Sequence, residues 1–457
     1  MPININFYNL SEISDADLNR IMLRSEADIK NVEQVVRPII ADIKENGDKA
    51  VIKYAKQFDS SDISQTGIKA TEQDFINAEN NLEPEIKQAI NHCIKNVRKF
   101  HEEQFSRIEK FWLSEVENGV TAGEIVNPIQ DIGIYVPRGK GCFPSVMYML
   151  CVPAVVAKVP NIVVVTPPND LGMIDDASLY AAQQSGVKNI YKVGGSQAVA
   201  SLAYGTETIP KVSKMVGPGN AYVAAARRIL ADKLDPGMPA GPSEALILAD
   251  STAHVYNTAL DILNEAEHGA DSASVLVTDS QELAMGVNDL LPKLISELPE
   301  KRRDFCTQGF SKNGYSAIIL TNNLQESIDF ANKYAVEHLL LKVENPSQVL
   351  PKLRNTGEVL IGEYSPIAMG NYGIGVNAIL PTGRHGKTYS ATSVWDFLIR
   401  TTVAYNNKQG YEGLATDVEN LTVYEGFTAH GDVIRKRQTL TKEQAKQQQK
   451  SLEKFNI

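Results

Sequence analysis

The feature that most constrains the fold is a repeated order of strand-like segment, glycine-rich loop and helix-like segment between residues 131 and 240. Apolar runs typical of buried strands cover residues 132–136, 162–166, 190–193 and 212–216. Glycine-rich loops follow three of them, at residues 137–144, 194–197 and 217–220. This alternation predicts a parallel sheet with crossover helices. Ligands of such sheets bind beyond the carboxyl ends of the strands, where these loops lie.

These loops do not contain the G-x-G-x-x-G sequence of ordinary dinucleotide-binding domains. Structural turns would explain any one of the loops. Because three such loops follow strands at equivalent positions, a nucleotide-binding site and a set of structural turns are equally good interpretations.

A second region of alternating strands and helices begins after residue 240. Its predicted strands are residues 245–248, 274–277, 316–320, 339–343 and 358–361. Helical periodicity dominates residues 1–130, and residues 396–457 are helical with a Lys- and Gln-rich end. The sequence therefore predicts an α/β protein with two parallel-sheet domains and helical extensions at both ends.

Composition excludes several classes of function. The 457 residues carry a formal net charge of −10, whereas a nucleic-acid binder needs a basic face. No apolar run reaches the roughly 18 residues of a membrane helix, and no signal peptide is evident at the start. The four cysteines lack C-x-x-C spacing. We therefore expect a cytoplasmic protein that binds neither nucleic acid nor membranes.

One acidic residue and one histidine lie at helical spacing within residues 264–272. Glu265 and His268 are three residues apart, so on a helix that continues to His268 they share one face. A carboxylate oxygen and an imidazole nitrogen can then converge on a cation, and Gly269 would end the helix there. The simpler interpretation is an exposed acidic helix end with one incidental histidine.

Glu337 and His338 stand at the start of a predicted strand, and each can take a proton. Adjacent side chains on an extended chain point to opposite faces, so both reach one substrate only if the backbone turns there. A surface charge pair is the alternative.

A long glycine-rich segment, residues 362–383, precedes a basic cluster of Arg384, His385 and Lys387. Segments of this kind within an enzyme are usually functional. The cluster would suit an anionic group of a substrate, or it is a solvated loop.

Eight short motifs occur in an order that resembles the histidinol dehydrogenase family, over residues 131–437. They are Tyr-Val-Pro-Arg-Gly (135–139), Val-Gly-Gly-Ser-Gln-Ala (193–198), Val-Gly-Pro-Gly-Asn-Ala-Tyr-Val (216–223), Gly-Pro-Ser-Glu-Ala (241–245), Ala-Glu-His-Gly-Ala-Asp-Ser (266–272), Glu-His-Leu (337–339), Leu-Pro-Thr-Gly (380–383) and Glu-Gly-Phe-Thr-Ala-His (425–430). Each motif is weak alone, and together they are specific.

The resemblance implies a zinc-containing, NAD-dependent homodimer that oxidises an alcohol to a carboxylate in two hydride transfers through an aldehyde. It also implies two incomplete Rossmann-like domains, which explains the missing dinucleotide fingerprint. Residues 131–240 would bind NAD, and residues 241–385 would carry the metal and catalytic motifs. Residues 1–130 would contribute to the second domain, and residues 386–457 would form the dimer.

The resemblance also implies roles for individual residues. Tyr135, Gln197 and Asn220 match NAD contacts, and Ser243 matches a substrate contact. Glu337 and His338 match the catalytic pair. His268 matches a metal ligand, and Glu425 and His430 match a substrate contact and a metal ligand that the neighbouring subunit contributes.

Three positions depart from the family pattern. Glu265 replaces a metal-ligating glutamine, and Asn371 replaces a ligating aspartate. The expected ligand set thus keeps one carboxylate, one amide and two imidazoles, which zinc accepts. Ala378 replaces a substrate-contacting histidine.

Because of Ala378, we expect a zinc- and NAD-dependent oxidation of a polar primary alcohol other than histidinol. A branch of similar enzymes oxidises a sulfonated propanediol, whose anionic group Arg384 and Lys387 would bind. The alternatives are a genuine histidinol dehydrogenase and a non-catalytic nucleotide- or metal-binding scaffold.

Overall fold

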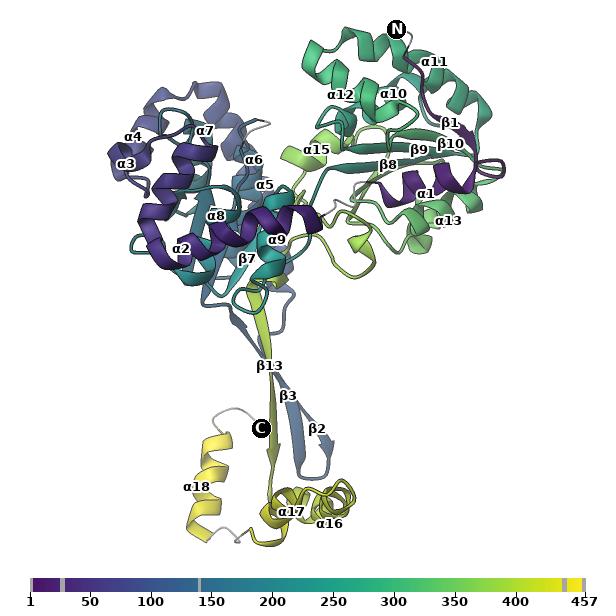
Figure 1. The fold of residues 1–457 in the computed structure, drawn as a ribbon. Helices are drawn as coiled ribbons and strands as arrows, with labels where there is room; N and C mark the ends of the chain where they lie inside the picture. The colour runs from purple at the N-terminus through teal and green to yellow at the C-terminus, as the bar shows by residue number, and fades with distance from the viewer. Residues whose placement is uncertain (1–2, 25–28, 139–140, 438–441, 454–457) are drawn as a thin grey trace. The chain divides into compact units, whose positions relative to one another are not determined.

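The computed structural model describes residues 3–24, 29–138, 141–437 and 442–453. Contacts divide the chain into two units (Figure 1). Unit 1 comprises Met1–Phe105 and Ile129–Phe397, and unit 2 comprises Ser106–Pro128 and Leu398–Ile457. In the parts that the structure describes, no helix is long and apolar enough to cross a membrane.

Unit 1 contains a six-stranded sheet, the larger sheet, in which all neighbouring strands are parallel. Its order is β1 (Phe7–Asn9), β10 (Ala317–Leu320), β9 (Ala273–Thr278), β8 (Glu244–Ala249), β11 (His338–Lys342) and β12 (Glu358–Ile361). The five strands predicted after residue 240 are confirmed. The edge strand β1 was not predicted, because three residues give too short a pattern.

A helical layer covers each face of the larger sheet (Figure 1). Alternate residues of β8 point to opposite faces, so Ala245 and Ile247 join one core while Leu246 and Leu248 join the other. The first core includes α10 (Val255–Ala266), α11 (Gln281–Glu297), α12 (Glu300–Phe310) and α15 (Ile367–Tyr372). The second includes α1 (Asp15–Leu23), α13 (Leu324–Tyr334) and α14 (Pro346–Val349), which η1 (Leu350–Lys352) follows.

The smaller sheet of unit 1 has four parallel strands and confirms the strands predicted between residues 131 and 240. Its order is β6 (Ile190–Lys192), β5 (Asn161–Thr166), β4 (Asp131–Tyr135) and β7 (Lys214–Val216). The helices between and after these strands are α6 (Pro144–Val156), α7 (Asp176–Ser185), α8 (Gly195–Tyr204) and α9 (Ala221–Ile229). The α/β fold class with parallel sheets is therefore confirmed.

The N-terminal helices are divided differently from the predicted domain plan. Only β1 and α1 join the larger sheet, whereas α2 (Ile29–Phe58) packs against α8 and α9 of the smaller one. The reason is the apolar stripe of α2, which includes Val36, Ile43 and Val51 and is buried in the core of the smaller sheet. The following helices are α3 (Ile63–Thr66), α4 (Glu72–Asn81) and α5 (Pro84–Ser106).

Unit 2 is built on an antiparallel sheet, and its strands were not predicted. β13 (Leu398–Asn406) pairs with β3 (Val120–Pro128), which pairs with β2 (Phe111–Glu117). Helices make up most of both extensions, as predicted, and these three strands were missed. β2 and β3 form a hairpin, whereas β13 pairs with β3 from far along the sequence. Three helices follow β13, namely α16 (Lys408–Tyr424), α17 (Thr428–Arg435) and α18 (Lys442–Glu453).

Candidate active site

The predicted catalytic pair lies at the amino-terminal edge of the larger sheet. Helix α13 ends at Tyr334, and its C-cap Ala335 has a left-handed backbone (φ 54°) that turns the chain before the strand. Glu337 precedes β11 and His338 is its first residue, and both are buried. His338 Nε2 lies 3.7 Å from Glu337 Oε1. The turn before the strand thus brings together two side chains that a continuous strand would separate.

A second carboxylate, Glu358, fixes the histidine ring. Glu358 is the first residue of β12, and the parallel register places it directly opposite His338. Its Oε1 lies 2.5 Å from His338 Nδ1. This contact holds the ring with Nε2 on the side of Glu337. Sequence reasoning missed Glu358, and the only signal was a charged residue at the start of a predicted strand.

An ion pair at the same edge supports Glu337. The backbone N–H of Glu244 donates to Glu337 Oε2 at 2.8 Å. The Glu244 carboxylate accepts hydrogen bonds from Arg24 at 2.5 Å and from the backbone N–H of Gly383 at 2.7 Å. Arg24 also lies over the Tyr334 ring, 3.9 Å from its centroid. These hydrogen bonds therefore link the start of β8 to the loop at Gly383 and to the end of α1, beside the catalytic pair.

The electrostatics of the pair favour proton transfer near neutral pH. Burial raises the pKa of Glu337 to about 8, with a further contribution from the Glu265 and Glu244 charges against that of His338. Burial opposes the charged form of His338, but the Glu337 charge and the bond to Glu358 outweigh burial and raise its pKa. Glu337 can therefore change its protonation within the physiological range.

Three of the four predicted metal ligands converge in unit 1. Helix α10 ends at Ala266, two residues earlier than expected, yet Glu265 Oε2 lies 3.5 Å from His268 Nδ1. The Asn371 side-chain amide, from α15, donates to Glu265 Oε1 at 3.0 Å. One carboxylate, one imidazole and one amide therefore meet at this point.

This donor set fits a zinc ion. His268 Nδ1 is buried and has no hydrogen-bond partner among the described residues, although a carboxylate oxygen faces it. Burial opposes ionisation of Glu265, but the charges of His268 and His338 and the Asn371 amide lower its pKa, so it is anionic. Within the described ranges no cluster of three His, Cys, Asp or Glu side chains could hold a metal. The third possible ligand beside Glu265 and His268 is the side-chain amide of Asn371, and asparagine is not one of these four residue types.

The predicted NAD contacts lie at the carboxyl-terminal edge of the smaller sheet. Tyr135 ends β4, and its hydroxyl accepts a hydrogen bond from the backbone N–H of Gly195 at 3.1 Å. Gly217 packs so closely that an added Cβ would lie 2.2 Å from the Tyr135 carbonyl oxygen. Gln197 is buried in the first turn of α8, and Asn220 caps α9. The loops after β6 and β7 thus meet at the end of β4.

Asn220 also has a structural role that its sequence motif did not indicate. Its side-chain oxygen accepts hydrogen bonds from the backbone N–H groups of Tyr222 and Val223, both at 3.1 Å. This is an ordinary helix N-cap. The side-chain amide nitrogen remains as the group that could contact a cofactor.

The predicted substrate residues Ser243 and Arg384 of unit 1 adjoin residues that make the hydrogen bonds around Glu244, beside the catalytic pair. Ser243 directly precedes Glu244 at the amino end of β8. Arg384 has a left-handed backbone (φ 66°) and begins η2 (His385–Lys387), and η3 (Val394–Phe397) follows. Burial lowers the pKa of Lys387, and the charges of Arg384 and Arg24 lower it further. The three cations are therefore close enough to repel one another.

The loop around Ala378 is held in place by its neighbour. Asn377 is buried, and its side-chain amide donates to the Met149 carbonyl at 2.6 Å. Its side-chain oxygen accepts a hydrogen bond from the Ile379 N–H at 3.0 Å. Ala378 itself is partly exposed. A methyl group therefore stands at a fixed position where the family resemblance implies a histidine.

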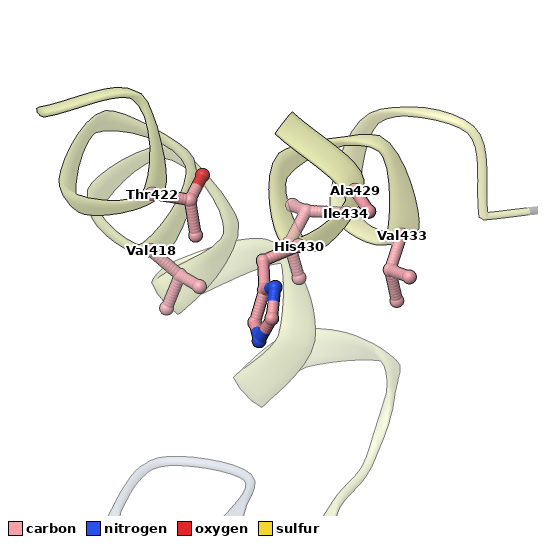
Figure 2. A pocket seen from close by; sticks show the side chains of 6 residues that line it. All are labelled: Val418, Thr422, Ala429, His430, Val433 and Ile434. Atoms are coloured by element: carbon pink, nitrogen blue, oxygen red, sulfur yellow. The ribbon is translucent and has the colours of Figure 1, made fainter. Parts of the chain in front are cut away.

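The two remaining predicted residues lie in unit 2. Glu425 caps the end of α16, and His430 lies on α17. Figure 2 shows the His430 ring beside an apolar pocket between these helices. Besides His430, the pocket is lined by Val418, Thr422, Ala429, Val433 and Ile434. Both predicted residues are exposed within unit 2.

A buried carboxyl group whose pKa is raised to about 8, next to converging metal-type donors, is typical of a catalytic site. The fold and the site therefore define an α/β enzyme. The family model of histidinol dehydrogenase matches residues 22–438, and the chain belongs to this family of oxidoreductases.

Relatives and a solved structure agree with this assignment. The chain is 44% identical over 431 residues to histidinol dehydrogenase of Synechocystis sp., covering 94% of this chain and 98% of that protein. It is 42% identical to a histidinol dehydrogenase homolog of Colwellia psychrerythraea, covering 95% and 97%. The crystal structure of histidinol dehydrogenase from Elizabethkingia anophelis superposes with a TM-score of 0.86 at 34% identity, covering 94% and 97%.

These comparisons favour the alternative substrate over the first expectation. Proteins named histidinol dehydrogenase are among the relatives, whereas nothing in the comparisons points to a sulfonated propanediol. NAD and zinc are consistent with the family.

Proposed function

We propose that this chain is an NAD- and zinc-dependent dehydrogenase that oxidises a primary alcohol through the aldehyde to the carboxylate, with histidinol as the favoured substrate. The observation that carries the proposal is the buried relay of Glu337, His338 and Glu358. It lies near Glu265, whose charge acts on both Glu337 and His338.

Each residue of the relay has a step that its position suits. In its neutral form His338 accepts the hydroxyl proton at Nε2, because Glu358 occupies Nδ1. Glu337 accepts a proton from the water that attacks the aldehyde, since its raised pKa makes it a competent base near neutral pH. Glu265, His268 and Asn371, with His430, would hold zinc, which lowers the pKa of the alcohol when bound.

The loops at the end of the smaller sheet suit NAD. The backbone N–H groups at the starts of α8 and α9 favour a pyrophosphate. Tyr135, Gln197 and Asn220 are the proposed contacts.

The test is NADH formation by the zinc-loaded protein with histidinol, followed at 340 nm, with histidine measured as product. Conversion with two NADH per histidine supports the proposal. Binding of NAD or zinc without turnover of any alcohol would instead favour the scaffold.

A second candidate is an alcohol with an anionic group. The observation that favours it is the pair of cations Arg384 and Lys387 in the turn after Gly383, together with Ala378 in place of a histidine. Anionic alcohols in the same assay distinguish the candidates. Lys387→Met should raise the KM of an anionic substrate and leave that of histidinol unchanged.

We also propose a homodimer in which His430 and Glu425 act in the site of a second copy. Unit 2 exposes apolar side chains that a monomer would cover, including Tyr424 at 91%, Val423 at 67% and Leu421 at 60%. Mixing His430→Ala with His338→Asn should restore activity, because one of two sites would be intact. No rescue after verified subunit exchange would show that each site uses one chain.

A further inference from the structure

We propose that Tyr148 and Asn96 are positioning residues that hold the metal ligand Asn371 in place from the lobe of the smaller sheet. This inference rests on the proposed zinc site. Neither residue belongs to a motif of the sequence analysis, and neither touches the catalytic pair. We assign this role because both side chains bind the end of the short helix α15, which carries Asn371.

Both residues donate hydrogen bonds to the end of α15. The Tyr148 hydroxyl donates to the Tyr372 carbonyl at 2.6 Å, and the Asn96 side-chain amide donates to the Gly373 carbonyl at 2.8 Å. The last carbonyls of a helix have no partner within it. These two consecutive carbonyls are therefore bound by α6 and α5, not by the sheet on which α15 packs.

The same helix carries its metal ligand to the larger sheet. Asn371 donates to Glu265 Oε1 at 3.0 Å, one residue before the carbonyl that Tyr148 binds. The preceding Gly370 lies so close to β12 that an added Cβ would be 3.1 Å from Glu358 Oε1. A six-residue helix has few contacts of its own, so its end depends on external partners. Ligands must be held within about 0.5 Å of their working geometry.

Tyr148 is well placed to act as a rigid support. It lies in the second turn of α6, whose side chains are almost all buried, and it is itself 3% exposed. The helix begins at Pro144, directly after the glycine-rich loop that follows β4. The phenol therefore presents its hydroxyl from a fixed backbone.

A merely structural tyrosine provides the matched control. Tyr180 on α7 is 5% exposed, and its hydroxyl accepts a hydrogen bond from the Asn91 side-chain amide at 2.9 Å. It joins α7 to α5 in the same lobe, and within the described residues it makes no hydrogen bond to α15. Tyr180→Phe thus removes an equivalent hydroxyl without touching the proposed support.

The experiment measures zinc affinity by competition with a chromophoric chelator, on the full chain without substrate. Tyr148→Phe should weaken zinc binding on the order of tenfold, as loss of an outer partner of a metal ligand does. Asn96→Ala, on a half-buried helix position, should act in the same direction. Tyr180→Phe should bind zinc like the wild type. The Co(II)-loaded Tyr148→Phe protein should also show shifted visible absorption bands, because the ligand geometry changes.

Thermal unfolding of the zinc-free proteins separates positioning from folding. Tyr148→Phe and Tyr180→Phe should unfold at similar temperatures while differing in zinc affinity. Equal zinc affinity of wild type, Tyr148→Phe and Asn96→Ala would overturn the inference alone. A wild type that binds no zinc would overturn the proposed metal site and the inference together.

Discussion

Replacement of Lys342 by methionine should destabilise unit 1 strongly. Lys342 ends β11, and its ammonium group lies 2.5 Å from Asp261 Oδ2 and 2.8 Å from Glu363 Oε2. Its side chain is 1% exposed and that of Asp261 9%. Asp261 lies on α10 one turn before Glu265, and Lys342 lies on β11 two alternations after His338. The lysine thus fixes the helix that carries Glu265 to the strand that carries His338.

The size of the loss follows from the burial of Asp261. Removing one partner of a buried pair costs about 3–5 kcal/mol, because the other charge stays buried without compensation. Methionine fills most of the lysine volume, so the cavity contribution is small. Glu363 is more exposed and keeps hydrogen bonds from the His254 backbone and the Asn257 side chain. The loss is therefore assigned to Asp261.

The loss should depend on pH in a definite direction. Burial already raises the pKa of Asp261 in spite of Lys342, and removal of the lysine raises it further. A raised folded-state pKa means that the native state binds more protons than the unfolded state, so stability falls as pH rises. The deficit of Lys342→Met should be largest above the folded-state pKa. It should shrink as pH falls toward the unfolded value of about 4.

Urea unfolding at pH 8 and pH 5, followed by circular dichroism, measures both effects. Lys53→Met is the control, since Lys53 pairs with Asp42 at 2.6 Å but is 59% exposed, and it should change little. Lys342→Met with Asp261→Asn should regain much of the loss. A deficit below about 1 kcal/mol at pH 8, or one that does not change with pH, would refute the argument.

Three further predictions concern catalysis. Glu358→Gln should lower kcat about 100-fold with zinc content unchanged, since the histidine ring loses its orienting carboxylate; equal kcat would exclude this role. The aldehyde step should accelerate as pH rises through about 8, where Glu337 loses its proton, and Glu337→Gln should abolish this limb of the pH–rate profile. Glu265→Gln should weaken zinc binding about tenfold or more, and adding Asn371→Asp should restore it, as chelator competition would show.

The sequence allowed prediction of the elements whose pattern is local. Nine strands of the two sheets, β4 to β12, are short apolar runs between turns, so their local pattern was enough to place them. The strands β2 and β13 are mostly exposed, and β3 is mostly half-buried, so none of the three shows a clear alternation. The pairing of β13 with β3 joins residues about 270 positions apart, which no local pattern reveals. The hairpin of β2 and β3 is local, and it was missed because its strands lack a buried apolar run.

In the candidate site, too, residues with nearby partners in the sequence could be predicted and residues with distant partners could not. Two pairs of site residues lie close together in the sequence, so their shared chemistry can be recognised there. The pairs are Glu337 with His338 and Glu265 with His268. Glu358 is placed by the order of strands in the sheet, since only adjacency of β11 and β12 sets it opposite His338. Arg24, Tyr148 and Asn96 are further cases, because the groups that they bind lie over 200 residues away.

In unit 1, the edges of the two sheets that carry the site residues have helix ends of opposite partial charge. At the carboxyl edge of the smaller sheet, α8 and α9 begin, and the positive ends of their dipoles favour the pyrophosphate of a dinucleotide. At the amino edge of the larger sheet, α10 and α13 end, and their negative ends favour cations. That edge also carries the carboxylates of Glu265, Glu337 and Glu358. A dication and a protonated histidine are therefore stabilised there, whereas phosphates are not. Under the proposed function, the usual rule for open α/β sheets would describe only the smaller sheet.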